Sequence, residues 1–152
     1  MVVIPPRENA DEWPGAAPDP GVKAELDRLT HTFLGAFTNT GGTLPNVDVI
    51  RDVFIPEGRI ISNVGPEPVL YDLDGFIAPR RKILTDGTLT EFSEWEVAER
   101  TEIFGGVAHR FSEYHKKGFL HGAWFEGAGH KSTQFVRTPA GWRMCSMAWD
   151  DV

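Results

Sequence analysis

The chain has 152 residues and a formal net charge of −7 at pH 7, a balance that disfavours non-specific binding to nucleic acid or to an anionic membrane. Its hydrophobic content of 41% and charged content of 24% are ordinary for one globular domain, which at this length buries a core without disulfides or metal. Cys145 is the only cysteine, no apolar run is long enough to cross a membrane, and no secretory signal opens the chain, so we expect a cytoplasmic protein.

Residues 1–20 differ in composition from the rest, because they hold five of the eleven prolines and several acidic side chains. This composition predicts a flexible, proline-rich N-terminal arm. Trp13 is the one residue of the arm with a reason to dock, since an exposed tryptophan is uncommon. We expect residues 21–152 to form a single domain.

The first helix is predicted to begin near Pro20. Its apolar residues recur at spacings of three and four and so form one stripe: Val22, Leu26, Leu29, Phe33 and Phe37. The segment TNTGGTLPN then breaks the helix.

Three short elements are predicted next. Apolar residues at helical spacing in 49–54 indicate a helix that Pro56 ends. The β-branched run RIISNV predicts a strand. A further helix is expected to begin at Asp72 or Asp74 as its N-cap, although Pro79 fits poorly inside it.

Strand patterns dominate the second half of the chain. The segment LTEFSEWEVAERTEIF alternates with a period of two, placing Trp95 and Ile103 on one face and Glu94 and Glu96 on the other. A turn at GG leads into the strand VAHRFSEYH, and KKG predicts the next turn. FLHGAWFEGAG fits either a strand or a loop, and HKSTQFVRT and WRMCSMAWDD form a hairpin through PAG. Helices followed by antiparallel strands indicate an α+β fold, with the helices packed on one face of a sheet.

Two segments of the strand region carry recognisable motifs, GGVAHRFSEY and GHKSTQFVRTPAGWRMCSMAWDD. They combine a strand with VA and S-x-Y, a strand with S-x-Q-x-V, and a closing strand with WR, S and W. In this they resemble the nuclear-transport-factor-2-like superfamily, and most closely its SnoaL-like and ketosteroid-isomerase-like branch. The resemblance covers about residues 22–152.

The resemblance implies a cone-shaped α+β fold. A strongly curved antiparallel or mixed sheet wraps around the N-terminal helices and leaves a pocket between sheet and helices. The open face of such sheets often forms a homodimer, which we expect here through residues such as Phe111, Phe135 and Trp142. We expect no metal ion or cofactor, since the histidines form no HExxH-like pattern and no phosphate-binding glycine loop is present.

The closing strand is central to the sheet in such a fold. Alternation then separates its side chains into two faces, unless a bulge exchanges the faces partway. We expect Met147, Trp149 and Asp151 to point into the pocket.

On the neighbouring strand, Arg137 is a poor fit for an apolar cavity. We therefore expect the opposite set, which includes Gln134 and Val136, to face the pocket. The expected ligand-binding residues are Phe33, Phe37, Phe54, Asn63, Trp95, Tyr114, Gln134, Val136, Met147 and Trp149.

The chemistry of the pocket is left open. The resemblance places Asn63 where ketosteroid isomerases have an aspartate base, and an amide cannot take that role. His109, Arg110 and Asp151 are the candidate catalytic residues, as acid–base or electrostatic groups. Alternatively, the histidine makes a structural hydrogen bond, the arginine lies on the dimer face, and the aspartate is solvated.

Three functions are compatible with these features. The first is a domain whose aromatic-lined, apolar pocket binds a small hydrophobic molecule. The second is a cofactor-independent enzyme of the polyketide cyclase, dehydratase or isomerase type. The third is a non-catalytic dimerisation scaffold whose cone is filled by side chains.

Overall fold

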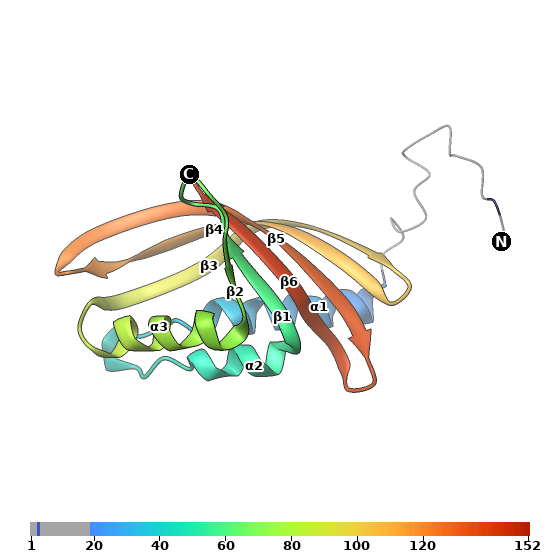
Figure 1. Ribbon diagram of the computed structural model, residues 1–152, viewed down its shortest axis with the longest axis horizontal. Helices are drawn as coiled ribbons and strands as arrows, with labels where there is room; N and C mark the ends of the chain where they lie inside the picture. The colour runs from blue at the N-terminus through green and yellow to red at the C-terminus, as the bar shows by residue number, and fades with distance from the viewer. Residues whose placement is uncertain (1–2, 4–18) are drawn as a thin grey trace.

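A computed structural model describes Val3 and residues 19–152 of the chain. The arm expected at residues 1–20 therefore lies almost wholly outside the described residues. In the described part, six strands form one open, mixed sheet, and three α-helices lie on its concave side (Figure 1). This is the curved α+β arrangement that the resemblance implies. No helix among the described residues is both long and apolar enough to cross a membrane.

Helix α1 (Pro20–Gly35) begins at the predicted residue. Asp19 caps it, because its carboxylate accepts hydrogen bonds from two backbone amides of the first turn, 3.0 and 3.1 Å away. Pro20 occupies the first helical position, where its missing N–H costs no hydrogen bond. Most of the predicted stripe is buried in the core: Leu26, Leu29, Phe33 and Phe37.

After α1 the chain forms two 3₁₀ turns, η2 (Thr40–Gly42) and η3 (Val47–Val49), and the single-turn helix α2 (Ile50–Val53). Strand β1 (Phe54–Ser62) follows at once. The prediction that the helix runs on to Pro56 is wrong, because the first residue of β1, Phe54, already pairs with Met144 in the closing strand of the chain.

Strand β2 (Val69–Tyr71) pairs with β1 at one edge of the sheet and leads into helix α3 (Leu73–Thr85). Asp72, one of the two predicted N-caps, caps this helix, and its carboxylate accepts a hydrogen bond from the Gly75 amide at 2.7 Å. Pro79 lies inside α3, so its poor fit to the helical pattern does not end the helix.

Four long strands complete the sheet: β3 (Leu89–Phe104), β4 (Val107–Leu120), β5 (Ala123–Thr138) and β6 (Gly141–Asp151). The strand order is β2-β1-β6-β5-β4-β3. Strands β1 and β6 are parallel, and all other neighbours are antiparallel. The closing strand is therefore an inner strand of the sheet, as the resemblance implies.

The turn between β4 and β5 lies at His121 and Gly122, so its predicted position at KKG is wrong. Both turn residues have positive φ, 50° and 79°, as a tight hairpin turn requires. The KKG segment instead continues β4. Its glycine, Gly118, sits where a Cβ would approach the backbone oxygen of Thr90 to 3.0 Å. The ambiguous segment FLHGAWFEGAG is thus two strand ends and their turn.

A β-bulge at Cys145 exchanges the faces of β6 partway along the strand. Gln134 pairs with Ser146 and the next residue of β5 pairs with Met144, so Cys145 is the extra residue. As a result, Met144 and Met147 are both buried in the core although they are three residues apart. Because of the bulge, buried residues before and after Cys145 both point to the concave face of the sheet.

Strand β5 presents the face opposite to the predicted one. Lys131, Thr133 and Phe135 are buried, whereas Gln134 is exposed on the convex side. The prediction is wrong because Arg137 lies near the end of β5, where its exposed side chain lies beside Gly106. Its charge therefore carries no information about the face that the middle of the strand turns inward.

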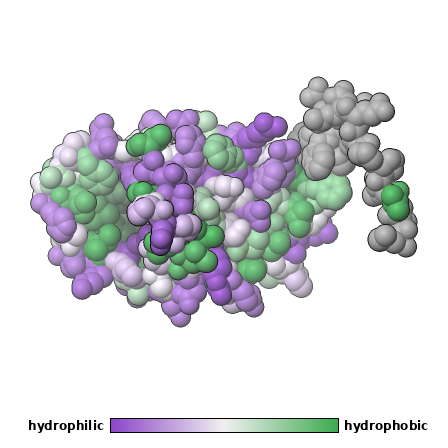
Figure 2. Space-filling model, turned by 45° about the horizontal axis from the view of Figure 1, so that its top comes forward, coloured by the Kyte–Doolittle hydropathy of each residue, from purple (hydrophilic) through white to green (hydrophobic). Residues whose placement is uncertain are grey.

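The convex face of the sheet carries exposed apolar side chains among charged ones. Figure 2 shows several apolar patches on the side of the molecule that it presents, separated by hydrophilic residues. Phe111 is 54% exposed there, but Phe135 and Trp142 are buried in the core. Of the three aromatic residues expected on the dimer face, only Phe111 is therefore accessible.

Candidate functional site

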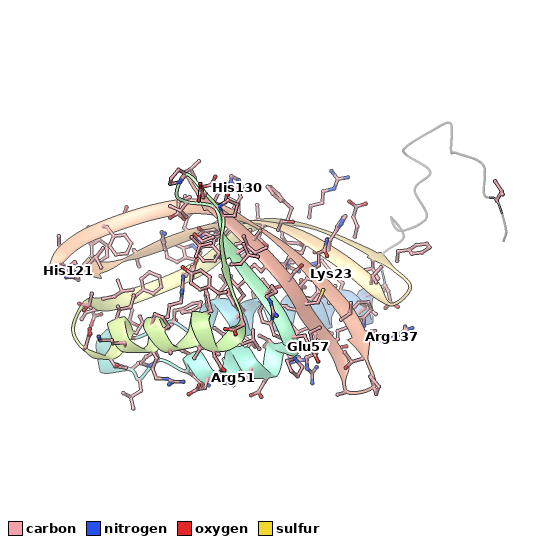
Figure 3. The ribbon with its side chains drawn as sticks, in the orientation of Figure 1. Lys23, Arg51, Glu57, His121, His130 and Arg137 are labelled. Carbon is pink, nitrogen blue, oxygen red and sulfur yellow. The ribbon has the colours of Figure 1, made fainter. Side chains whose placement is uncertain are left out.

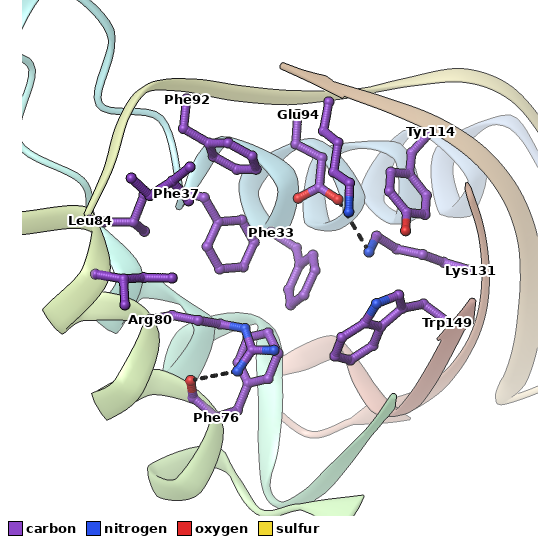
Figure 4. Close-up of a pocket in the computed structure, with 13 residues that line it drawn as sticks. Phe33, Phe37, Phe76, Arg80, Leu84, Phe92, Glu94, Tyr114, Lys131 and Trp149 are labelled. Carbon is purple, nitrogen blue, oxygen red and sulfur yellow. Dashed lines mark hydrogen bonds and ion pairs between the residues drawn. The ribbon is translucent and has the colours of Figure 1, made fainter. Parts of the chain in front are cut away.

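A cavity of about 150 Å³ opens between α1, α3 and the concave face of the sheet. That volume is comparable to an engineered cavity that takes up benzene. Side chains of α1, of α3 and of strands β3 to β6 converge on it (Figure 4). The lining residues are Phe33, Phe37, Phe76, Arg80, Ile83, Leu84, Leu89, Phe92, Glu94, Tyr114, Lys116, Lys131 and Trp149.

Aromatic rings form most of the apolar wall. Phe33 and Phe76 stack with ring centroids 6.2 Å apart, and Phe37 meets Phe33 edge-on at 5.4 Å. Trp149 meets Phe76 at 6.0 Å with an interplanar angle of 82°. These offset and edge-on contacts are the favourable geometries for aromatic pairs, so the rings hold each other in place around the cavity.

A buried ion pair crosses one side of the cavity. The Lys131 side chain is 8% exposed, and its Nζ lies 3.3 Å from Oε1 of Glu94. The same ammonium lies 4.0 Å from the centroid of the Tyr114 ring, within range of a cation–π contact. Burial lowers the pKa of Lys131, and the charge of Glu94 offsets this only in part.

A cluster of hydrogen-bonded side chains, formed by Tyr114, Lys116 and Asp151, adjoins the cavity. The Tyr114 hydroxyl donates a hydrogen bond to Oδ1 of Asp151 at 2.5 Å, and Nζ of Lys116 lies 2.9 Å from Oδ2. Burial and the bond to the carboxylate raise the pKa of Tyr114. Burial alone would raise the pKa of Asp151, but the hydrogen bonds from Tyr114 and Lys116 outweigh it and lower that pKa.

Gly129 makes room for this cluster. It pairs with Tyr114 on one side and Asp151 on the other. A Cβ at Gly129 would lie 2.5 Å from the Tyr114 hydroxyl oxygen. A glycine in the middle of a strand often marks such a close approach, so this residue was a signal for the cluster in the sequence.

Arg80 contributes the remaining charge of the cavity wall. Its guanidinium carbon lies 3.7 Å from the centroid of the Phe76 ring and 5.5 Å from that of Trp149. It donates one hydrogen bond, of 3.3 Å, to the backbone oxygen of Phe76. Among the described residues, no carboxylate lies within 4.0 Å of this guanidinium. Burial lowers the pKa of Arg80, and Tyr71 and Glu94 offset this only in part.

Four of the ten predicted ligand-binding residues line the cavity: Phe33, Phe37, Tyr114 and Trp149. Phe54 and Met147 are buried in the core and do not line it. The other four lie away from the cavity: Asn63, Trp95, Gln134 and Val136.

Trp95 illustrates why alternation alone misplaced some residues. Glu94 and Glu96 of β3 point toward the helices, where they form ion pairs with Lys131 and Arg110. Trp95 between them therefore points to the convex side and is 40% exposed. The apolar set of β3 thus faces outward along this part of the strand. Ion pairs with partners on other strands decide the face, and single-strand periodicity does not reveal them.

The candidate catalytic residues do not meet in one site. His109 is exposed, with its Nε2 3.0 Å from Glu102 of the neighbouring strand. Arg110 is buried outside the cavity lining, where Glu96 and Asp27 bind it. Arg110 therefore does not lie on the dimer face. Asp151 alone adjoins the cavity, through the Tyr114 hydroxyl.

The histidines are far apart in the described structure. Figure 3 shows His121 at the tip of the β4–β5 hairpin and His130 on the convex side of the sheet. Among residues 19–152, no group of three or more His, Cys, Asp or Glu side chains is placed to hold a metal ion.

Sequence reasoning missed Arg80, Glu94 and Lys131. Arg80 lies one turn after Phe76 on α3, and this spacing puts it on the apolar face of the helix. Glu94 and Lys131 carried no comparable local signal, because their pairing depends on two strands that are not neighbours in the sheet.

No protein-family profile matches the chain, and no curated protein matches it in sequence. Solved structures do match. A nuclear-transport-factor-2-like superfamily protein from Salmonella enterica serovar Typhimurium superposes with a TM-score of 0.70 at 14% identity, over 86% of this chain and 91% of that one. The chain has the nuclear-transport-factor-2-like fold.

Two further structures share this fold. A nuclear-transport-factor-2-like protein with a cystatin-like fold from Novosphingobium aromaticivorans matches with a TM-score of 0.64 and 14% identity, over 87% of this chain and 82% of that one. A protein from Exiguobacterium sibiricum, named for a calcium/calmodulin-dependent kinase II association domain, matches with a TM-score of 0.64 and 12% identity, over 91% and 98%. At these identities the likeness concerns the nuclear-transport-factor-2-like fold alone.

Proposed function

We propose that the protein binds a small, planar, hydrophobic molecule in the cavity between the helices and the sheet. The observation that carries this proposal is the open volume of about 150 Å³ ringed by aromatic side chains. Such a lining favours flat apolar ligands. The open volume also argues against a scaffold whose cone is filled by side chains.

Calorimetric titration with indole, a flat apolar probe, tests this proposal. Ile83→Trp would fill part of the cavity, because Ile83 belongs to its lining. Lys82→Trp adds the same ring at the exposed neighbouring position of α3 and serves as the matched control. We expect wild type and Lys82→Trp to bind indole and Ile83→Trp to lose most of the binding. Equal binding by all three proteins, or none by wild type, contradicts the proposal.

The SnoaL-like and ketosteroid-isomerase-like branch remains our proposal for the kind of protein. Two residues of the motifs that carry the resemblance, Tyr114 and Trp149, line the cavity and support it. The position taken by the base in ketosteroid isomerases holds Asn63, which is exposed and outside the cavity. The isomerase route of that family is therefore not part of the proposal.

Catalysis is the second candidate function, and the buried Lys131 favours it. A lysine whose pKa is lowered by burial is a better proton acceptor near neutral pH than an exposed one. Exchange of the α-protons of phenylacetone in D₂O, followed by NMR, tests for such a base. We expect wild type to accelerate exchange and Lys131→Met to abolish the acceleration. Exchange at the buffer rate with wild type contradicts this function.

We also propose a homodimer formed through the convex face of the sheet. Exposed apolar residues on this side support it, among them Phe111 and Trp95. The likeness to a protein named for an association domain is consistent with assembly by this fold. Sedimentation velocity at micromolar concentration tests the proposal, and a single species with the mass of one chain, 16.9 kDa, contradicts it.

A further inference from the structure

The charges around the cavity do not balance. Lys131 is matched by Glu94, and Lys116 is matched by Asp151. Arg80 is the third cation of the wall, and within the described structure it has no carboxylate partner. A largely buried cation without a partner is costly, so the cavity favours a ligand that brings a negative charge.

The donors of Arg80 are available to such a ligand. A guanidinium has five N–H groups, and among the described residues one of them bonds to the backbone oxygen of Phe76. The Tyr71 ring lies 5.2 Å from the same group and acts to raise its pKa, which leaves further N–H donors for a ligand. The Phe76 ring covers one flat face of the group at 3.7 Å. Stacking of this kind leaves the edge of the guanidinium free for an acceptor, and a carboxylate matches that edge with two parallel hydrogen bonds.

The space beside Arg80 suits a single aromatic ring. Figure 4 shows the guanidinium at the border of the open space, opposite Lys131, with Phe33 and Trp149 between them. The cavity volume of about 150 Å³ fits one ring, or a fused pair as compact as indole, and leaves little space for a larger polycyclic skeleton. A ligand that satisfies both charge and shape is therefore flat, monocyclic and acidic.

We propose that the cavity selects monocyclic aromatic carboxylates, with the ring among Phe33, Phe76 and Trp149 and the carboxylate paired with Arg80. This inference rests on the proposed binding function and names the class of ligand. Neither the family resemblance nor the fold assigns a role to Arg80. Lys131 and Glu94 stay paired with each other in the complex and close the opposite side of the cavity.

Titration with benzoate and with its neutral analogue benzyl alcohol, at pH 7 in low salt, tests the inference. We expect benzoate to bind at least about tenfold more tightly, which is the scale of a charge-assisted hydrogen bond. Arg80→Met keeps most of the side-chain volume and should weaken benzoate binding about tenfold or more, and weaken benzyl alcohol binding much less. Arg81→Met is the matched control, because Arg81 is the next residue, is exposed and pairs with Asp48.

The outcomes separate the inference from the proposed function on which it rests. Equal affinities for the two probes, or equal losses in the Arg80 and Arg81 variants, overturn the inference and leave the binding cavity in place. Failure of wild type to bind benzoate, benzyl alcohol and indole overturns the proposed function itself. If Arg80→Met does not fold, the ratio of the two wild-type affinities and the weaker benzoate binding expected of Arg80→Lys still decide the question.

Discussion

At the scale of single residues, the hydroxyl of Tyr114 links the cavity to the C-terminal end of the sheet. Tyr114 is buried, and its hydroxyl donates a hydrogen bond of 2.5 Å to Asp151, which also pairs with Lys116. Glycine is required at position 129 between them, because a Cβ there would collide with the hydroxyl oxygen of Tyr114. Three strands thus position one carboxylate, which the sequence alone presented as a terminal acidic residue.

This arrangement predicts a pH dependence of stability. The pKa of Asp151 is lower in the folded protein than its ordinary value of 3.8, so the charged carboxylate stabilises the fold above about pH 4. That stabilisation is lost as the pH falls through the folded-state pKa. We expect the free energy of unfolding of wild type to decrease more steeply, as the pH falls below about 4, than that of Asp151→Asn.

Urea unfolding at a series of pH values measures this difference. Asp150→Asn is the control, since Asp150 is the neighbouring aspartate and is exposed. It should keep the steep acid dependence of wild type. Parallel curves for wild type and Asp151→Asn would show that the carboxylate does not carry the effect.

At the scale of elements, local patterns predicted what each segment is better than which way it faces. The apolar stripe of α1 and the cap at Asp72 depend on neighbours within one helix, and both were readable in the sequence. The faces of β3 and β5 depend on ion pairs between strands. Periodicity assigned the face of β3 wrongly, and the charge of Arg137 misled the assignment of β5. The bulge at Cys145 likewise depends on the partner strand.

An ion cluster attaches α1 to the sheet at the element scale. Arg110 of β4 donates two hydrogen bonds to Glu96 of β3, 2.6 and 3.0 Å long, and one of 2.5 Å to Asp27 of α1. The Arg110 side chain is 1% exposed and that of Glu96 is 6% exposed. Burial alone would lower the pKa of Arg110, but these carboxylates outweigh it and raise that pKa.

Removing Arg110 takes the guanidinium away from the buried carboxylate of Glu96. Asp27, in contrast, keeps its ion pair with Lys23. We expect Arg110→Met to lower the free energy of unfolding by about 3 kcal/mol, because breaking a buried pair leaves an uncompensated charge. Arg100→Met, at an exposed arginine of the same hairpin, should change it by less than about 0.5 kcal/mol. Urea denaturation compares the two variants, and similar midpoints would contradict a role of the cluster in holding α1.

At the scale of the whole molecule, the curvature of the sheet separates a covered concave face from an exposed convex face. The concave face carries the core and the cavity, and the family resemblance anticipated both, because they follow from helices packed inside a bent sheet. The convex face carries Phe111, whose ring stacks on His130 with centroids 5.3 Å apart. Exposed apolar side chains lie among charged ones on this face, and Phe111 is one of the large ones.

If the convex face forms the dimer, a charge at its centre should separate the two copies. Phe111→Asp would place a carboxylate in an interface that needs about 800 Å² per partner to be stable. Leu44→Asp is the matched control, since Leu44 is equally apolar, is exposed, and lies between η2 and η3, away from the sheet. We expect sedimentation velocity to show a dimer for wild type and Leu44→Asp and a monomer for Phe111→Asp. Because the cavity opens on the concave side, Phe111→Asp should bind indole as wild type does. A dimer that persists in Phe111→Asp would move the interface to another surface.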